Sequence, residues 1–228
     1  MTRAAFLFAL QLGDSALPTG RFSHSYGLEE LLAQETVAED AVVELVESVV
    51  LHVVAPLDAV ALAEAHRLAA LADVEGLRRV DRAVTARKLT PSSRHASTAC
   101  GRRLAVLSQS LTSDETCDRF AEDVAAGRSD GNLAVVEGAL ACALAIDLEE
   151  AILLELRGTA VALLSAALRL GKISALRAQA MLAALVPTLT EGLEIALRLS
   201  VDEMRSVAPE LDIAAMSHGR RDARIFAT

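Results

Sequence analysis

The residues best suited to chemistry lie in one polar run near the start of the chain, 14-DSALPTGRFSHSYGLEE-30. Ser23, His24 and Ser25 are neighbours in this run, and a serine activated by a histidine is a common hydrolase nucleophile. Such chemistry needs a base within hydrogen-bond reach and a third group that orients it, a geometry that adjacent residues seldom have. An all-α hydrolase centred on Ser25 and His24 is one hypothesis for this protein.

Metal ligation is a second use for the same histidine. Imidazole and thiolate suit nickel or zinc, so His24, His218 and Cys142 are candidate ligands. A stable site needs three or four converging groups, and the sequence contains neither H-E-x-x-H nor C-x-x-C. A stand-alone nickel carrier that uses His24 and His218 is the second hypothesis. We expect no tightly bound cofactor, with nickel held at most transiently.

Other enzyme signatures are missing from the sequence. It has no G-x-x-x-x-G-K-[ST] and no G-x-G-x-x-G, so nucleotide chemistry of those kinds is not indicated. His52 and His66 fall within helical patterns and are interpreted as core or flank histidines, whereas His95 is expected at the surface. The residue types favour a protein that binds other proteins over an enzyme.

Composition narrows the class further. The 228 residues are 53% hydrophobic but only 3% aromatic, with no Trp, which suits closely packed helices. A formal net charge of −9 argues against nucleic-acid binding, which needs clustered Lys and Arg. The uncharged run 158–168 is shorter than the ~20 residues of a membrane span, so we expect no membrane and a cytoplasmic location. Three widely spaced cysteines, Cys100, Cys117 and Cys142, predict buried thiols and no disulfide framework.

Helical periodicity predicts an all-α protein, a single compact multi-helix domain of roughly eight to ten helices over residues 1–228. An N-terminal segment and loop, 1–25, precede the helices, and a C-terminal docking segment, 207–228, follows them. Expected helix starts are the caps Asp73, Thr90, Thr112, Asp147 and Ser174. Pro56 is expected to end one helix and open the next.

The opening run also carries a resemblance. LQLGDSALPTGRFSHSYGLE is similar to the N-terminal signature of the urease accessory protein UreF family. The matching positions are Leu12, Asp14, Ser15, Leu17, Pro18, Gly20, Phe22, His24, Ser25, Gly27 and Glu29. PELDIAAMSHGRRDARIF resembles the family's ending, at Pro209, His218, Arg224 and Phe226.

The chain departs from that pattern at four places. Arg21 stands where the family often has Gly, Ala or Ser, and Asn132 stands where a His-Pro-like pair is common. Gly171 and Lys172 stand where Leu-Gly-Gln is usual, and the match resumes near Gln179. Gly219 stands where the family usually has a Glu after the histidine, here His218. These departures affect individual contacts more than the fold.

The resemblance implies a third hypothesis, a non-catalytic chaperone for nickel insertion into urease. Members of the family are all-α, commonly dimeric, and assemble with UreD (also called UreH) and the GTPase UreG on the urease apoprotein. UreF is thought to bridge these proteins and to modulate the GTPase. The partner-binding residues we expect on this basis are His24, Ser25, Tyr26, Glu29, Arg169, Lys172, Gln179, His218, Arg224 and Phe226.

Each of these positions also has a simple structural explanation. The opening run is then a capped loop that Phe22 anchors in the core. Arg169 and Lys172 are then basic residues placed at a helix C-terminus by the macrodipole. The arginines of the tail are then solvated, although Phe226 predicts that the tail docks on a helix or a partner.

Overall fold

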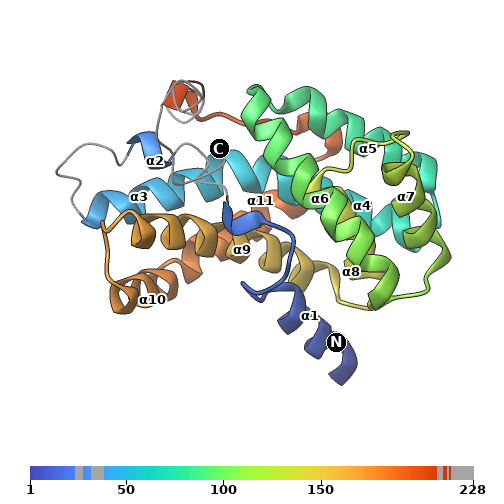
Figure 1. Cartoon of the computed structure of the whole chain (residues 1–228), viewed down its shortest axis with the longest axis horizontal. Coiled ribbons are helices and arrows are strands. Elements are labelled where there is room, and N and C mark those ends of the chain that lie inside the picture. The colour runs from blue at the N-terminus through green and yellow to red at the C-terminus, as the bar shows by residue number, and fades with distance from the viewer. Residues whose placement is uncertain (24–27, 32–38, 210–212, 215, 217–228) are drawn as a thin grey trace.

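The computed structural model covers residues 1–228 and describes all of them except 24–27, 32–38, 210–212, 215 and 217–228. Throughout the described residues the regular elements are all helical, as the sequence predicts (Figure 1). The α-helices are α1 Arg3–Leu12, α2 Leu28–Leu31, α3 Glu39–Val49, α4 Val60–Ala70, α5 Val74–Arg87, α6 Pro91–Leu111, α7 Glu115–Ala125, α8 Leu133–Ala143, α9 Leu148–Arg169, α10 Ala175–Ala184 and α11 Val186–Arg198.

Three further helical pieces connect them. A π-helix, η2 Val50–Ala59, joins α3 to α4 in one continuous helix. Two 3-10 turns, η1 Arg21–Ser23 and η3 Val201–Glu203, precede α2 and follow α11. When α3, η2 and α4 count as one helix, the described part of the chain has ten α-helices, within the expected range.

Side-chain caps fix where several helices begin. Asp73, Thr90 and Ser174 each accept a hydrogen bond from a backbone N–H of the first helical turn, which confirms the predicted starts of α5, α6 and α10. The prediction for α7 was wrong by two residues. Its cap is Asp114, whose carboxylate reaches the first turn, while the hydroxyl of Thr112 accepts the N–H of Asp114.

Pro56 does not end a helix, which corrects the expectation that it separates two. It lies inside η2, within a helix that runs unbroken from Ala41 to Ala70. Proline lacks an N–H, and in an α-helix its ring collides with the carbonyl of the residue four positions earlier. The chain accommodates this clash through the wider π-helical pattern rather than through a break.

The core is one cluster of buried apolar side chains that extends from Ala5 in α1 to Met204 after α11. α8 is buried along almost its whole length and packs against α4 and α6. At Gly138 an added side chain would collide with the carbonyl of Leu62, so this glycine permits the close approach of α8 to α4. α9 lies beside α11 (Figure 1) and also contacts α8 and η2.

Two helices of the described chain are long and apolar enough to cross a membrane by length and composition alone. They are Ala41–Ala70 and Leu148–Arg169, and the bent pair Ala175–Ala184 and Val186–Arg198 also passes if it is taken as one span. Counting uncharged runs missed them, because a spanning window tolerates one or two charges. In the structure 67% of the apolar window of each of the two long helices is buried inside the protein. Their apolar surface therefore serves the core.

A buried carboxylate, Asp81 of α5, organises the loop before α8. It accepts hydrogen bonds from the Ser129 hydroxyl at 2.6 Å, from the N–H of Gly131 at 2.9 Å and from the N–H of Asn132 at 2.8 Å. The amide of Asn132 donates to the same carboxylate at 2.8 Å and to the Thr85 hydroxyl at 2.8 Å. Asn132, a departure from the family pattern, thus ties α8 to α5.

Candidate partner-binding surface

Residues 14–23, the described part of the polar run before α2, form a tight loop after α1. The Asp14 carboxylate accepts the N–H of Ala16 at 2.8 Å, and the Asp14 carbonyl accepts the N–H of Leu17 at 3.1 Å. Gly20 has a φ of +84°, a conformation that glycine adopts without steric cost. We call residues 14–23 the signature loop.

Two arginines from neighbouring helices hold the backbone of the signature loop. Arg103 of α6 donates from Nη1 to the carbonyl of Thr19 at 3.2 Å. Arg169, in the last turn of α9, donates from Nη2 to the carbonyl of Phe22 at 2.7 Å. Because both bonds end on main-chain carbonyls, they fix the path of the loop and not only its side chains.

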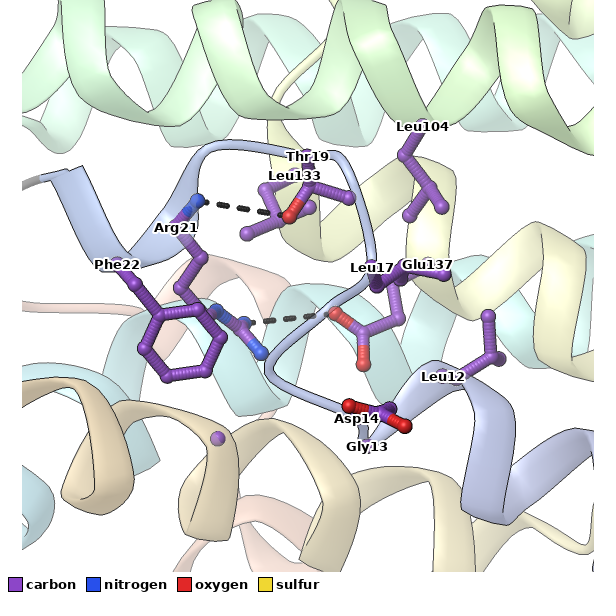
Figure 2. Close-up of a pocket in the computed structure, with 11 residues that line it drawn as sticks. Leu12, Gly13, Asp14, Leu17, Thr19, Arg21, Phe22, Leu104, Leu133 and Glu137 are labelled. Atoms are coloured by element: carbon purple, nitrogen blue, oxygen red, sulfur yellow. Dashed lines mark hydrogen bonds and ion pairs between the residues drawn. The ribbon is translucent and has the colours of Figure 1, made fainter.

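A third arginine, Arg21, belongs to the loop itself and extends into the protein (Figure 2). Its Nη2 pairs with the carboxylate of Glu155 of α9 and lies 3.4 Å from Oε2 of Glu137 of α8. Arg21 is 7% exposed, Glu137 5% and Glu155 4%. Since a buried charge is costly unless it is paired, this arrangement ties the loop to α8 and α9.

One guanidinium faces two carboxylates in this cluster. Burial raises the pKa of Glu137 above its ordinary value, and the positive charge of Arg21 offsets only part of that effect. Glu137 therefore takes up a proton more readily than an exposed glutamate. Glu155 is the carboxylate nearer to the Arg21 guanidinium.

Space for the guanidinium comes from a glycine in the middle of α9. A Cβ at position 158 would collide with Nη1 of Arg21, so Gly158 leaves room for the ion pair. A small cavity of about 20 Å³ adjoins the cluster and is lined by residues that include Leu12, Phe22 and Leu133. That volume is large enough to hold one water molecule.

The structure reassigns the anchor of the loop. We expected Phe22 to reach the core, but Phe22 is only half-buried, and Arg21 is the residue that enters the interior. Sequence reasoning missed Arg21, Glu137 and Glu155 as a cluster. The available signals were a charge in an otherwise apolar helix, 133-LAVVEGALACA-143, and a helix-interior glycine in α9.

The predicted partner-binding residues fall into three groups. His24, Ser25, Tyr26, His218, Arg224 and Phe226 lie outside the described residues. Glu29 is in α2, is 4% exposed, and belongs to a helix that packs on α9. Arg169 contacts the signature loop. Lys172 comes three residues after Arg169 and is half-buried, and Gln179 is exposed on α10.

Two of the described histidines, His66 and His95, behave as the sequence predicts, whereas His52 is exposed on its helix. His66 Nε2 lies 2.9 Å from the carbonyl of Ile146, so it is a satisfied helix-flank histidine, and His95 is exposed. Among the residues that the structure describes, no group of three or more His, Cys, Asp or Glu is placed to hold a metal ion. His24 and His218, the candidate nickel ligands, are not among those residues.

The cysteines are confirmed as largely buried thiols. Cys100 and Cys117 are buried, and Cys142 is half-buried. Burial raises the pKa of all three, that of Cys117 to about 11. The thiols therefore stay protonated near neutral pH, which suits packing rather than nucleophilic chemistry.

Fold and site together define an all-helical protein in which buried and helix-borne charges hold a surface loop in place. The family model for UreF matches residues 37–186. Urease accessory protein UreF 2 of Brucella canis is 33% identical over 96% of this chain and 90% of its own length. Urease accessory protein UreF of Trichodesmium erythraeum is 29% identical over 97% of this chain and 96% of its own length. Urease accessory protein UreF of Yersinia enterocolitica is 28% identical over 99% of both chains. The chain belongs to the UreF family.

Proposed function

We propose that this protein is a urease accessory protein that holds other proteins in a fixed arrangement. In this proposal it bridges UreD (UreH) and the GTPase UreG on the urease apoprotein, modulates the GTPase and supports assembly of the nickel centre. Membership of the UreF family carries the proposal, because the compared relatives are named urease accessory proteins. We place it in the cytoplasm as a homodimer that binds neither nucleic acid nor membrane, with nickel bound at most transiently.

The signature loop supports a binding role through its rigidity. Its carbonyls are held by Arg103 and Arg169, and Arg21 pins it to two core helices. A loop that is ordered before it meets a partner loses less conformational entropy on binding, which leaves more of the contact energy for affinity. The outer residues of the loop, including Asp14 and Pro18, are exposed.

The residues that follow the loop extend the same surface in our proposal. His24, Ser25 and Tyr26 come directly after η1, and both η1 and α2 pack on α9. The described residues on either side of this segment therefore pack on the same helix. We assign the partner contacts to these three residues, and to Glu29 the supporting role that its burial suits.

The C-terminal end of α9 supplies positive charge beside the loop. Arg169 and Lys172 stand there, on a protein whose net charge is −9. Such a local basic site favours an acidic patch on a partner and orients its approach. We assign Gln179, on the neighbouring α10, and the tail residues His218, Arg224 and Phe226 to partner contact as well.

The experiment is a pull-down with purified UreD and UreG, paired with nickel-dependent activation of urease. We expect the wild-type protein to capture UreD and, in its presence, UreG. Arg169→Ala is expected to weaken capture at least tenfold. Arg157→Ala is the matched control, because Arg157 is an exposed arginine of the same helix, about 18 Å away along its axis.

Two results would overturn the proposal. One is no capture of either protein together with unchanged urease activation in its absence. The other is tight stoichiometric nickel binding by the isolated protein, abolished by changing His24 and His218, which would favour the carrier hypothesis. Urea unfolding of each variant separates lost binding from lost folding.

A further inference from the structure

The long helix Ala41–Ala70 contains a feature that the family assignment does not explain. Ten consecutive residues, Val50–Ala59, are π-helical. Stretches of π-helix are rare, and most are single turns. Pro56 accounts for the irregularity, because it cannot donate an N–H to the carbonyl of His52, its α-helical acceptor. A donor from elsewhere in the chain also reaches this carbonyl.

That donor comes from the chain after η3. The N–H of Val207 donates to the carbonyl of His52 at 3.0 Å, and the N–H of Arg205 donates to the carbonyl of Pro56 at 3.0 Å. We call residues 204–207 the strap. Its two bonds are spaced two residues apart on the strap and four apart on the helix, so an extended segment lies along one face of the π-helix.

Two other contacts hold this junction together. Met204, the first residue of the strap, is 4% exposed, and its carbonyl accepts a hydrogen bond from Arg87 Nε of α5 at 2.9 Å. Lys88, the residue that follows α5, forms an ion pair with Asp58 of the π-helix, with 2.8 Å between Nζ and Oδ1. The end of α5 therefore clamps both the strap and the helix that the strap covers.

We propose that the strap is a clip that stabilises the π-helical segment and links it to the position of the C-terminal segment. With the strap in place, the carbonyls of His52 and Pro56 have donors. With the strap lifted, each carbonyl loses this donor from outside the helix, and the segment around Pro56 opens more often. A protein that pulls the chain beyond residue 207 away from the helix thereby loosens the centre of Ala41–Ala70. This device is independent of the proposed function.

Hydrogen exchange of the full-length protein tests the clip directly. Val207→Pro removes the N–H that serves His52, and Val207→Ala is the matched control, since the Val207 side chain is 61% exposed. We expect exchange over residues 50–61 to accelerate about tenfold in Val207→Pro, the effect of losing one hydrogen bond worth about 1.4 kcal/mol. Exchange in Val207→Ala and in α7 of both variants is expected to match the wild type.

A pair of truncations guards against a local effect of the introduced proline. A chain that ends after Ala208 keeps the strap, and a chain that ends after Glu203 lacks it. We expect faster exchange over 50–61 only in the shorter chain. Equal exchange in the two chains, or in the two Val207 variants, overturns the proposal. No urease partner enters either measurement, so failure here leaves the proposed function untouched.

Discussion

Arg21 of the signature loop pairs with Glu155 in the middle of α9, 134 residues further along the chain. Both side chains are buried, and Glu137 of α8 lies on the same guanidinium. This relationship gives a residue outside the family pattern a defined task. Arg21 forms an ionic link between the loop and two core helices, and a small residue at position 21 could not form that link.

Removing Arg21 should destabilise the protein strongly. Arg21→Met leaves two buried carboxylates without a counter-charge, and breaking one side of a buried pair costs about 3–5 kcal/mol. The free energy of unfolding from urea titration measures this loss. Replacing both partners, in Arg21→Met/Glu155→Gln, should recover more than half of it. A loss below about 1 kcal/mol in the single variant would show that the pair is not a structural link.

Gly158 should be required only while Arg21 is present. Alanine favours a helix interior over glycine by about 1 kcal/mol, yet at position 158 its Cβ collides with the guanidinium. We therefore expect Gly158→Ala to destabilise the wild-type protein and to stabilise the Arg21→Ala variant. The measurement is a double-mutant cycle of urea midpoints. If Gly158→Ala changed the stability of the wild type and of Arg21→Ala in the same direction, the contact between position 158 and Arg21 would be contradicted.

Stability should fall with rising pH because of Glu137. Its pKa is higher in the folded protein than in the unfolded chain, where it is about 4.3. Between the unfolded and the folded pKa, the folded state therefore binds more protons than the unfolded chain. The stabilisation from the protonated Glu137 is complete below about pH 4.3 and declines as pH rises towards the folded pKa. Glu137→Gln should flatten that slope in urea titrations from pH 4.5 to 8.

The control for Glu137 is Glu149→Gln, a change at an exposed position in the first turn of α9. It should leave the pH slope of the wild type in place. Parallel stability curves for the wild type and Glu137→Gln would mean that the buried carboxyl does not titrate differently in the folded state.

Asn132 should matter more for folding than for partner contact. Its amide donates to Asp81 and Thr85, and all of these bonds are lost in Asn132→Ala. The Asp81 carboxylate keeps its bonds from Ser129 and from two backbone N–H groups, so the cost is that of the lost side-chain bonds, about 1–3 kcal/mol because one of them ends on a charged group. We expect a lower thermal midpoint with unchanged capture of UreD and UreG by the folded protein. Ser129→Ala, which removes a single bond to Asp81, should cost less.

Much of the architecture could be predicted because its causes are local. Caps such as Asp73 and Thr90 act within one helical turn, and their helices begin where the sequence indicates. Pro56 was misjudged because the local rule predicts a break, whereas the chain continues through it as a π-helix. Residues far along the chain, Arg205 and Val207, donate hydrogen bonds to this segment, and local sequence rules do not see such contacts.

The candidate site divides in the same way. The residue types of the opening run, from Leu12 to Glu29, and of the C-terminal segment indicated the UreF family, and the comparisons confirm it. The sequence alone also determined an all-helical protein, since apolar periodicity is a property of neighbouring residues. Only the tertiary structure decided that Arg21 is the buried anchor, because the charges that stabilise it, Glu137 and Glu155, belong to helices brought to the loop by folding.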